Sequence, residues 1–241
     1  MRYPCLLALF SLMTASAADI QSPEALGGGK AMLRLEAPRA EHVKVLGDWV
    51  KPGETLEMAK NDAGVWSATV GPLPPGAYIY SFEVDGRTMA DPINPAAKLR
   101  SAGVGSLLYI AGDPPALWEA RDVPHGEVRI HFEKSEILGD ETRWMFIYTP
   151  PGYDQDRDKS YPVLYLLHGS NDTAAGWVMV GAANYILDNL IAAGKAKEMI
   201  VVMPYGHAVP YGSPSEMQAK NTELFERYLL DEIMPLPSGS L

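Results

Sequence analysis

The sequence predicts an N-terminal immunoglobulin-like β-sandwich followed by an incomplete three-layer α/β domain. Three observations predict this order. Short alternating apolar segments bounded by turn residues fill residues 24–113. A proline-rich, polar stretch without periodicity occupies residues 114–126 and is typical of a linker. In residues 127–241 the pattern becomes buried strand, helix, buried strand, helix, which indicates a parallel sheet with helical crossovers.

The first 17 residues have the layout of a secretory signal peptide. Arg2 precedes an apolar run from Leu6 to Met13, and the small residues Ala15–Ala17 follow it. The run is much shorter than the ~20 residues that a membrane-spanning helix needs. We therefore expect cleavage near Ala17 and a secreted or periplasmic protein. The one cysteine, Cys5, lies inside this segment, so the mature chain is expected to have no thiol for disulfides, metals or catalysis.

The charge of the chain bears on its partners. The formal net charge is −10 at pH 7, which gives no basic footprint for nucleic acid or anionic lipid. We therefore expect no nucleic-acid and no membrane partner, and neutral or cationic partners fit better. The acidity is better explained by solubility than by a substrate.

The predicted sandwich consists of short strands at close spacing. Each apolar run is bounded by Gly, Pro, Asp or Asn, with turn signals at Asn61–Asp62, Pro74–Gly76 and Asp85–Gly86. Half-buried strands of this kind are typical of two sheets packed face to face. The predicted strands are 31–35, 43–46, 55–58, 65–70, 77–84 and 106–110.

The second domain is expected to open with a hairpin and then change to α/β. Two strand candidates, Val128–Phe132 and Arg143–Tyr148, flank a turn signal at Gly139–Asp140. Val163–Leu167 is a continuous apolar run between Pro162 and Gly169, as in a strand covered on both faces. The remaining elements are a helix over 182–193, a strand over 200–203 and a helix over 222–234 ended by Pro235. Two central strands are few for such a sheet, so we expect it to continue and one strand edge to be uncovered.

Part of the first domain resembles the early-set sandwich of carbohydrate-binding module family 48, which is found in front of starch-active enzymes. The resemblance rests on Val45–Trp49, Gly64–Trp66, Pro75–Gly86 and Asp91–Pro92. Sugar binding through Trp49 or Trp66 would follow from it. Trp66 lies within an alternating strand, however, and aromatic residues on such strands mostly fill the core, which favours packing over binding.

The second domain resembles carbohydrate esterase family 1, the feruloyl and acetyl-xylan esterases, a pattern shared with esterase D-like and enterobactin esterases. The segments that carry the resemblance are Tyr148–Tyr153, Tyr161–Gly169, Asn184–Asp188 and Ile200–Pro204. The resemblance implies an α/β-hydrolase fold and hydrolysis of an ester on plant-wall polysaccharide. It implies a serine mechanism and no cofactor.

A serine hydrolase of this type needs a nucleophile in Gly-x-Ser-x-Gly, a histidine base and an acid that orients it. The sequence has no such motif, because Gly212–Pro214 and Ser238–Ser240 lack the flanking pattern. We therefore expect a chain truncated at its C-terminus, with the triad beyond Leu241, and no activity for the chain as it stands. Whether it is an enzyme stays open.

One catalytic part is expected in the loop after the first parallel strand. By resemblance, the backbone amide of Ser170 or of its neighbour Gly169 would donate to the oxyanion. The alternative, weighed evenly, is that Gly169 only permits a tight strand exit. His168 precedes the nucleophile position, so we expect it to make a structural hydrogen bond to the loop.

Three further residues are candidates for substrate binding. Asn171 and Trp177 follow the oxyanion loop and could face a sugar or an aromatic acyl group, although core packing of Trp177 is equally expected. His207 follows the second parallel strand and could border the pocket, but a solvated loop histidine is the favoured interpretation. The histidines and carboxylates show no metal-ligand spacing, so no metal is expected.

Two rival functions remain open. In the first, the sandwich binds a glucan and the second domain is a non-enzymatic platform. In the second, the chain belongs to an esterase of an enterobactin-type siderophore. An ester of plant-wall polysaccharide is the favoured substrate, and the sequence does not indicate an oligomeric state.

Overall fold

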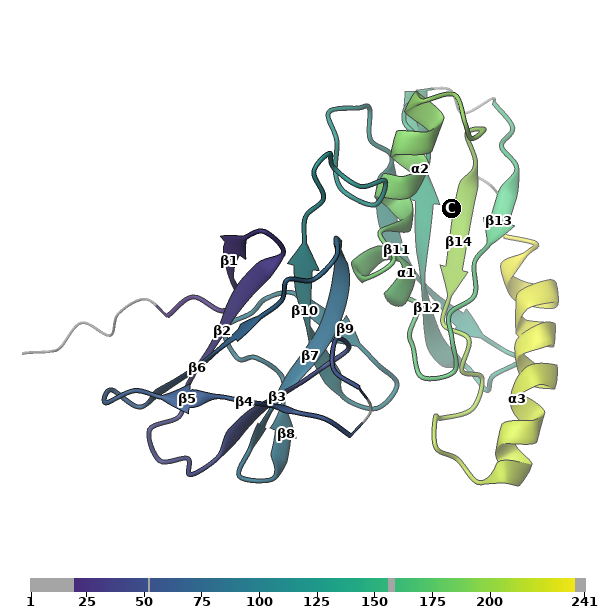
Figure 1. Cartoon of the computed structure of the whole chain (residues 1–241). Coiled ribbons are helices and arrows are strands. Elements are labelled where there is room, and N and C mark those ends of the chain that lie inside the picture. Colours follow the sequence, from purple (N-terminus) through teal and green to yellow (C-terminus); the bar gives the residue numbers. More distant parts are fainter. Residues whose placement is uncertain (1–19, 52, 156–158, 237–241) are drawn as a thin grey trace, which may run out of the picture.

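The computed structural model describes residues 20–51, 53–155 and 159–236. The predicted signal peptide, residues 1–17, lies outside the described residues. Two bodies are visible, a β-sandwich and a second domain that contains the helices (Figure 1). No helix in the described part of the chain is long and apolar enough to cross a membrane.

The first domain consists of two packed sheets, as predicted. One has the order β1-β2-β6-β5, and the other has the order β4-β3-β7-β10-β9 with β8 paired to β7. All six predicted strands are present, although the segment 55–58 contributes only the two-residue β4. The sequence did not predict four further strands, β1, β5, β8 and β9. Each has only two to four residues and no buried side chain, so its sequence has no alternation of apolar and polar residues. The strands are β1 (Glu24–Gly27), β2 (Lys30–Glu36), β3 (Val43–Gly47), β4 (Leu56–Glu57), β5 (Ala59–Lys60), β6 (Val65–Val70), β7 (Gly76–Val84), β8 (Arg87–Met89), β9 (Ala97–Leu99) and β10 (Val104–Ile110).

The core of the sandwich contains Trp66, whose role in packing or in sugar binding the sequence left open. Its side chain is buried, and its indole Nε1 donates a hydrogen bond of 2.9 Å to the carbonyl oxygen of Ala37. Trp49 is partly buried and packs edge-on against Tyr78. Its indole covers Gly47, where an added Cβ would lie 2.6 Å from the ring. The expectation that Trp66 fills the core is therefore confirmed.

A buried carboxylate ties the N-terminal segment to the sandwich. Asp91 Oδ2 accepts hydrogen bonds from Ser22 Oγ (2.6 Å) and Tyr80 OH (2.7 Å). Burial, followed by the bond to Asp91, raises the pKa of Tyr80, so this phenol remains a donor.

The second domain is built on a mixed four-stranded sheet with the order β11-β12-β14-β13. β11 (Glu127–Ser135) and β12 (Glu141–Thr149) form an antiparallel hairpin with nine residue pairs. β13 (Val163–Tyr165) runs parallel to β14 (Ile200–Pro204), and β14 runs antiparallel to β12. The hairpin and the parallel pair are thus confirmed. β13 ends at Tyr165 and forms the outer edge of the described sheet, with Val163 and Leu164 exposed. The expectation of a strand that reaches Leu167 and is covered on both faces was therefore wrong, because no further strand of the described chain pairs with β13.

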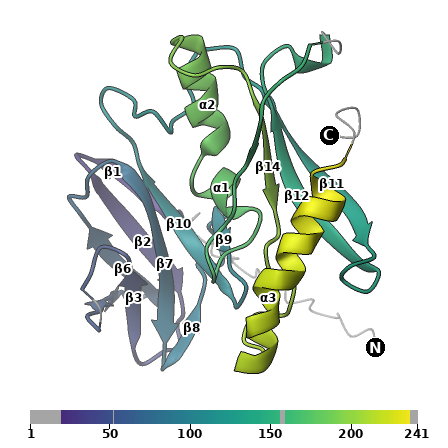
Figure 2. The same cartoon turned by 90° about the vertical axis from the view of Figure 1, so that its right-hand side faces the viewer.

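Helices pack on both faces of this sheet (Figures 1 and 2). α1 (Gly176–Met179) and α2 (Ala183–Ala192) lie on the face formed by Phe146, Tyr148 and Val201. α3 (Ser215–Arg227) and the π-helical segment Tyr228–Ile233 lie on the other face. The only other helical turn in the described part of the chain is Tyr153–Gln155. This arrangement agrees with an esterase-like domain, while the full α/β-hydrolase layering stays a prediction.

The predicted start of the last helix was wrong by seven residues. The sequence pattern placed it at Thr222, whereas α3 begins at Ser215, directly after Pro214. The first two turns of α3 are largely exposed and carry no apolar stripe, so the periodicity that locates a helix was missing there.

The linker between the domains packs on α2 instead of running free. Asn189 Nδ2 donates to the carbonyl oxygens of Leu117 (2.8 Å) and Glu119 (2.9 Å). Asp188 accepts hydrogen bonds from the Gly126 amide (2.9 Å) and from Tyr148 OH (2.7 Å), and it lies 2.8 Å from His125 Nδ1. Two consecutive residues of α2 therefore anchor both ends of the linker.

Candidate active site

The loop that follows β13 turns at Ser170 and Asn171, where the Asp172 amide donates to the Gly169 carbonyl at 3.0 Å. His168 Nδ1 donates to the Gly169 carbonyl at 2.8 Å, and its Nε2 accepts from the Gly206 amide at 2.8 Å. The imidazole therefore connects the loop after β13 to the loop after β14. Both ring nitrogens are engaged, which agrees with the expected structural role and not with a free catalytic base.

The sandwich reaches across to this loop through the turn between β9 and β10. Lys98 Nζ lies 2.7 Å from Asp172 Oδ2, and the two side chains are only 15% and 21% exposed. Ser101 Oγ donates to the Asp172 carbonyl at 2.8 Å. Because both contacts reach Asp172, the first domain fixes the side chain and the backbone of the loop at one residue.

A pocket of about 200 Å³ lies beside these contacts, between the loop and α1. Trp177 is 37% exposed, and its Nε1 donates to the Leu167 carbonyl at 3.0 Å, which fixes the plane of the indole. A Cβ at Gly176 would lie 2.6 Å from Asp172, so glycine is needed there for close approach. The lining residues are Lys98, His168, Gly169, Asp172, Gly176, Trp177, Val180 and Gly181.

Two of the predicted site residues, Gly169 and Trp177, therefore meet in one pocket. Trp177 is exposed at the pocket wall and not packed in a core, and its role in substrate binding stays a prediction. Ser170 and Asn171 are exposed in the same loop but do not line the pocket. The oxyanion assignment of Gly169 and Ser170 stays a prediction.

His207 differs from the expectation of a solvated histidine. Its side chain is only 8% exposed, and its Nε2 lies 2.9 Å from Ser101 Oγ of the sandwich. The ring centroid lies 5.1 Å from that of His168 and 5.6 Å from that of Tyr211. The expectation of a solvated histidine was wrong, because Ser101 of the sandwich and aromatic rings of the second domain contact His207. His207 does not line the pocket described above.

Only one assignment of donors and acceptors fits the hydrogen bonds of Ser101 and His207. A serine hydroxyl has a single proton. Since Ser101 Oγ donates to the Asp172 carbonyl, His207 Nε2 is assigned as the donor to Ser101. The hydroxyl proton thus points away from the imidazole, which is the reverse of a nucleophile activated by a base.

Burial lowers the pKa of His207 below its usual value. The neighbouring His168 and Arg143 lower it further, and the hydrogen bond to the Asp172 backbone partly offsets the lowering. Since Arg143 Nη2 donates to the His207 carbonyl at 2.7 Å, a positive charge is held close to this histidine.

We expect the stability of the protein to fall at acidic pH partly because of His207. The unfolded chain takes up a proton near pH ~6.5, whereas folded His207 takes it up only at lower pH. The free energy of unfolding should therefore decrease as the pH falls through about 6.5. Above about pH 7.5, His207 should make no contribution to the pH dependence of the free energy of unfolding. Urea unfolding between pH 5 and 8 measures the slope, which His207→Gln should reduce. An unchanged slope in this variant would rule out the assignment.

The described residues do not hold a complete hydrolytic centre. Within residues 20–51, 53–155 and 159–236, no serine is hydrogen-bonded to a histidine that a carboxylate also orients. The same part of the chain has no group of three or more His, Cys, Asp or Glu side chains that could hold a metal ion. The site is therefore a pocket with a shaped backbone loop.

The comparisons with known proteins agree with the two-domain arrangement. Residues 135–239 match the family model described as putative esterase, and residues 21–97 match carbohydrate-binding module 48, the isoamylase N-terminal domain. The two matches follow the order of the two domains, with the family 48 match on the sandwich and the esterase match on the second domain. An endo-1,4-β-xylanase/feruloyl esterase from Xylanibacter ruminicola is 36% identical over 214 residues, which are 86% of this chain and 29% of that protein.

A solved enterobactin esterase shows a similar fold. The enterobactin esterase of Shigella flexneri superposes with a TM-score of 0.57 and 18% identity, covering 86% of this chain and 58% of that chain. A family 1 ferulic acid esterase from Anaeromyces mucronatus gives a TM-score of 0.42 with 30% identity, covering 48% of this chain and 44% of that chain. The chain thus spans about three fifths of the enterobactin esterase and under a third of the xylanase relative.

The sequence alone missed Lys98 and Ser101. Both lie in the sandwich, just after the residues that match family 48, and they contact Asp172 and His207 more than 70 residues further along the chain. Neither residue belongs to a motif, and no pattern of neighbouring residues predicts a contact between domains.

Proposed function

We propose that this protein is an exported serine-type carbohydrate esterase, or part of one, that acts on feruloyl or acetyl esters of plant-wall polysaccharide. The observation that carries the proposal is the pocket beside Gly169, because this pocket is lined both by the loop after β13 and by the exposed side chain of Trp177. The description of the Xylanibacter ruminicola relative supports a feruloyl ester as substrate. The apolar segment in residues 1–17 supports export.

The pocket suits an aromatic acyl group with a polar end. The Trp177 indole offers a flat apolar surface for a phenyl ring. Lys98 also lines the pocket, where its ammonium group can donate to a carbonyl or phenol oxygen. With the acyl ring on Trp177, the ester carbonyl would lie near the Gly169–Ser170 turn, whose amides would then donate to the developing oxyanion.

In the proposed reaction a serine oxygen attacks the ester carbonyl carbon, and a histidine accepts the serine proton. The same histidine returns that proton to the leaving sugar hydroxyl, and water then releases the acid from the acyl-enzyme. The described residues contribute the pocket and the oxyanion turn to this sequence. Because the 241 residues contain no Gly-x-Ser-x-Gly, we propose that they bind the ester without cleaving it.

Calorimetric titration with methyl ferulate, combined with chromatography of free ferulic acid, tests this proposal. We expect saturable binding at one site and no acid release above the buffer rate. Absence of binding would contradict the pocket assignment. Release of acid would contradict the proposed inactivity, and its loss in Ser101→Ala would identify Ser101 as the nucleophile. Enterobactin in the same titration tests the rival siderophore substrate.

A second candidate function is glucan binding by the family 48 module. A groove of about 460 Å³ lies along residues 46–55, with Asp48, Lys51 and Glu54 on its walls. Trp49 packs next to this groove through Gly47. Hydroxyl groups of a sugar fit such charged and polar walls.

We expect retention on insoluble starch or xylan to depend on the groove. Lys51→Ala and Glu54→Ala together should reduce the retained fraction several-fold if the module binds glucan, because both side chains are exposed and neither supports the core. Lys30→Ala, an exposed change outside the groove, is the control. Equal retention of all variants, or none by the unchanged protein, would reject this candidate.

A further inference from the structure

β11 is the edge strand of the second domain's sheet on the side opposite β13, and its outer edge is unpaired in the described chain. β11 has nine residues in unbroken register with β12, and no other strand of the described chain pairs with its far side. Ile130 and Phe132 on this strand are 53% and 65% exposed, the highest values among the large hydrophobic side chains described. Long, regular edges with exposed apolar residues usually pair with another strand.

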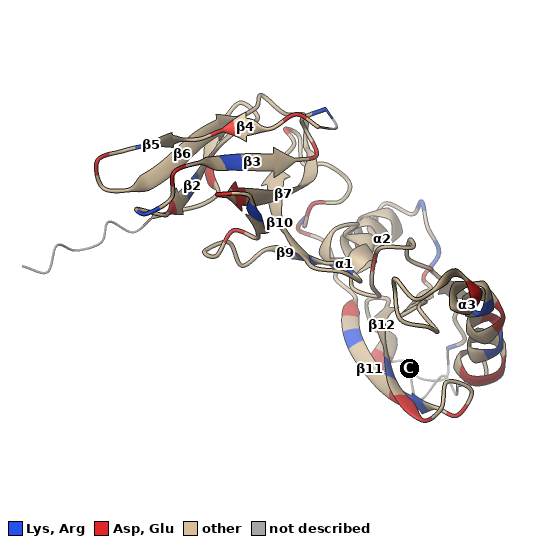
Figure 3. Cartoon of the chain, turned by 90° about the horizontal axis from the view of Figure 1, so that it is seen from below, with Lys and Arg blue, Asp and Glu red and all other residues tan. Residues whose placement is uncertain are grey.

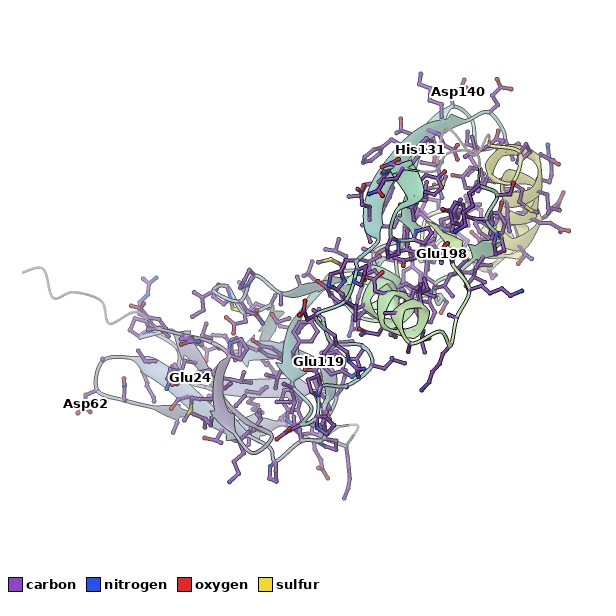
Figure 4. All side chains as sticks on the ribbon, turned by 90° about the horizontal axis from the view of Figure 1, so that it is seen from above. Glu24, Asp62, Glu119, His131, Asp140 and Glu198 are labelled. Carbon is purple, nitrogen blue, oxygen red and sulfur yellow. The ribbon has the colours of Figure 1, made fainter. Side chains whose placement is uncertain are left out.

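Charged residues occur along β11 (Figure 3), and three of them lie on the face opposite Ile130 and Phe132. Glu127, Arg129, His131 and Glu133 share this face, because successive side chains point to opposite sides of a strand. His131 lies midway along the strand and is labelled in Figure 4. Glu133 Oε1 accepts from Tyr228 OH at 2.9 Å, which holds this carboxylate in place.

We propose that β11 is the interface of a symmetric dimer, in which it pairs antiparallel with β11 of a second copy about a two-fold axis at His131. In this register Arg129 lies opposite Glu133 of the partner subunit, and Ile130 lies opposite Phe132 of the partner subunit. The sheet of four strands in each copy becomes one sheet of eight. Both pairs occur twice, as an isologous interface requires.

The neighbouring registers are less favourable. If the axis moves to Ile130, Glu127 faces Glu133 of the partner subunit and two negative charges oppose each other. If the axis moves to Phe132, Ile130 faces Lys134 of the partner subunit. Only the register centred on His131 matches opposite charge on one face with apolar contact on the other.

The charge pair sets the register, and the backbone and apolar contacts provide most of the stability. Arg129 also contacts Glu127 and Asp154 of its own chain, so its guanidinium is already held on this face. Exposed ion pairs contribute little on their own. The four side chains of Ile130 and Phe132 from both copies would leave water together beside Trp144 and Phe146 of β12.

Cross-linking tests the register directly, in the full chain with Cys5→Ser. Opposed residues of antiparallel strands have Cα atoms about 4.5–5.5 Å apart, which suits a disulfide. His131→Cys alone should therefore form a disulfide-linked dimer under mild oxidation. Arg129→Cys and Glu133→Cys should link each other efficiently in an equimolar mixture and themselves poorly. Leu164→Cys, on the opposite edge strand, is the control and should stay monomeric.

Sedimentation velocity tests the interface in the protein without added cysteines. We expect a concentration-dependent dimer that Phe132→Lys shifts at least ten-fold toward monomer, while Leu230→Lys, an equally drastic change at an exposed residue outside β11, leaves it unchanged. Arg129→Glu should weaken the dimer, and adding Glu133→Arg should restore it. Circular dichroism confirms that each variant is folded. A monomer at all concentrations, a dimer insensitive to Phe132→Lys, or preferential linking through Leu164→Cys would overturn the proposal.

Discussion

Replacing Asp188 with alanine is expected to lower the free energy of unfolding by about 3–5 kcal/mol, one of the two largest effects that the structure leads us to expect. The carboxylate is 1% exposed and accepts from the Tyr148 hydroxyl and the Gly126 amide. Burial, followed by the bond to Asp188, raises the pKa of Tyr148, so this hydroxyl remains a donor that alanine would leave without its acceptor. Urea unfolding at neutral pH measures the loss.

Asp188→Asn provides the matched control. The amide retains one oxygen that can accept from Tyr148 or Gly126, so the loss should be smaller than with alanine. Asp91→Ala removes an equally buried aspartate of the sandwich, where it should destabilise the first domain without freeing the linker. A loss below about 1 kcal/mol for Asp188→Ala would show that water replaces the carboxylate at no great cost.

Replacing Trp177 with alanine is expected to weaken methyl ferulate binding at least ten-fold. The indole provides the largest flat apolar surface among the pocket residues, and stacking of aromatic rings contributes about 0.5–1.5 kcal/mol beyond the area that it buries. Trp177→Phe keeps a ring but loses the bond to the Leu167 carbonyl, so its effect should be intermediate. Calorimetric titration measures the dissociation constants.

Tyr185→Ala is the matched control for Trp177. Both side chains are 37% exposed, but Tyr185 packs edge-on against His125 at the linker and does not line the pocket. Its removal should leave the affinity for methyl ferulate unchanged. Equal affinities for Trp177→Ala and Tyr185→Ala would contradict the role given to Trp177.

Local sequence patterns were sufficient for most of the secondary structure. The spacing of apolar residues and the positions of glycine and proline predicted the β11–β12 hairpin, the parallel pair of β13 and β14, and α2. These signals depend only on residues that are neighbours in the sequence. The start of α3 could not be predicted, because its first turns are exposed and polar.

The site was predictable only where a single segment builds it. The turn at Gly169 and the position of Trp177 follow from one loop after one strand, and the structure brings both to the same pocket. Lys98 and Ser101 could not be found, since their role depends on how two domains pack. The same docking buries His207, which a local interpretation leaves in solvent.

We propose that the pocket between the sandwich and the second domain is the site of ester binding, and hydrogen–deuterium exchange with saturating methyl ferulate tests this proposal most directly. Two segments far apart in the chain meet at this pocket through the contact of Lys98 with Asp172. We expect slower exchange in residues 97–103 and 166–181 together, with residues 46–55 unchanged. Protection confined to residues 46–55, or protection of residues 166–181 that persists undiminished in Trp177→Ala and Lys98→Ala, would contradict the account.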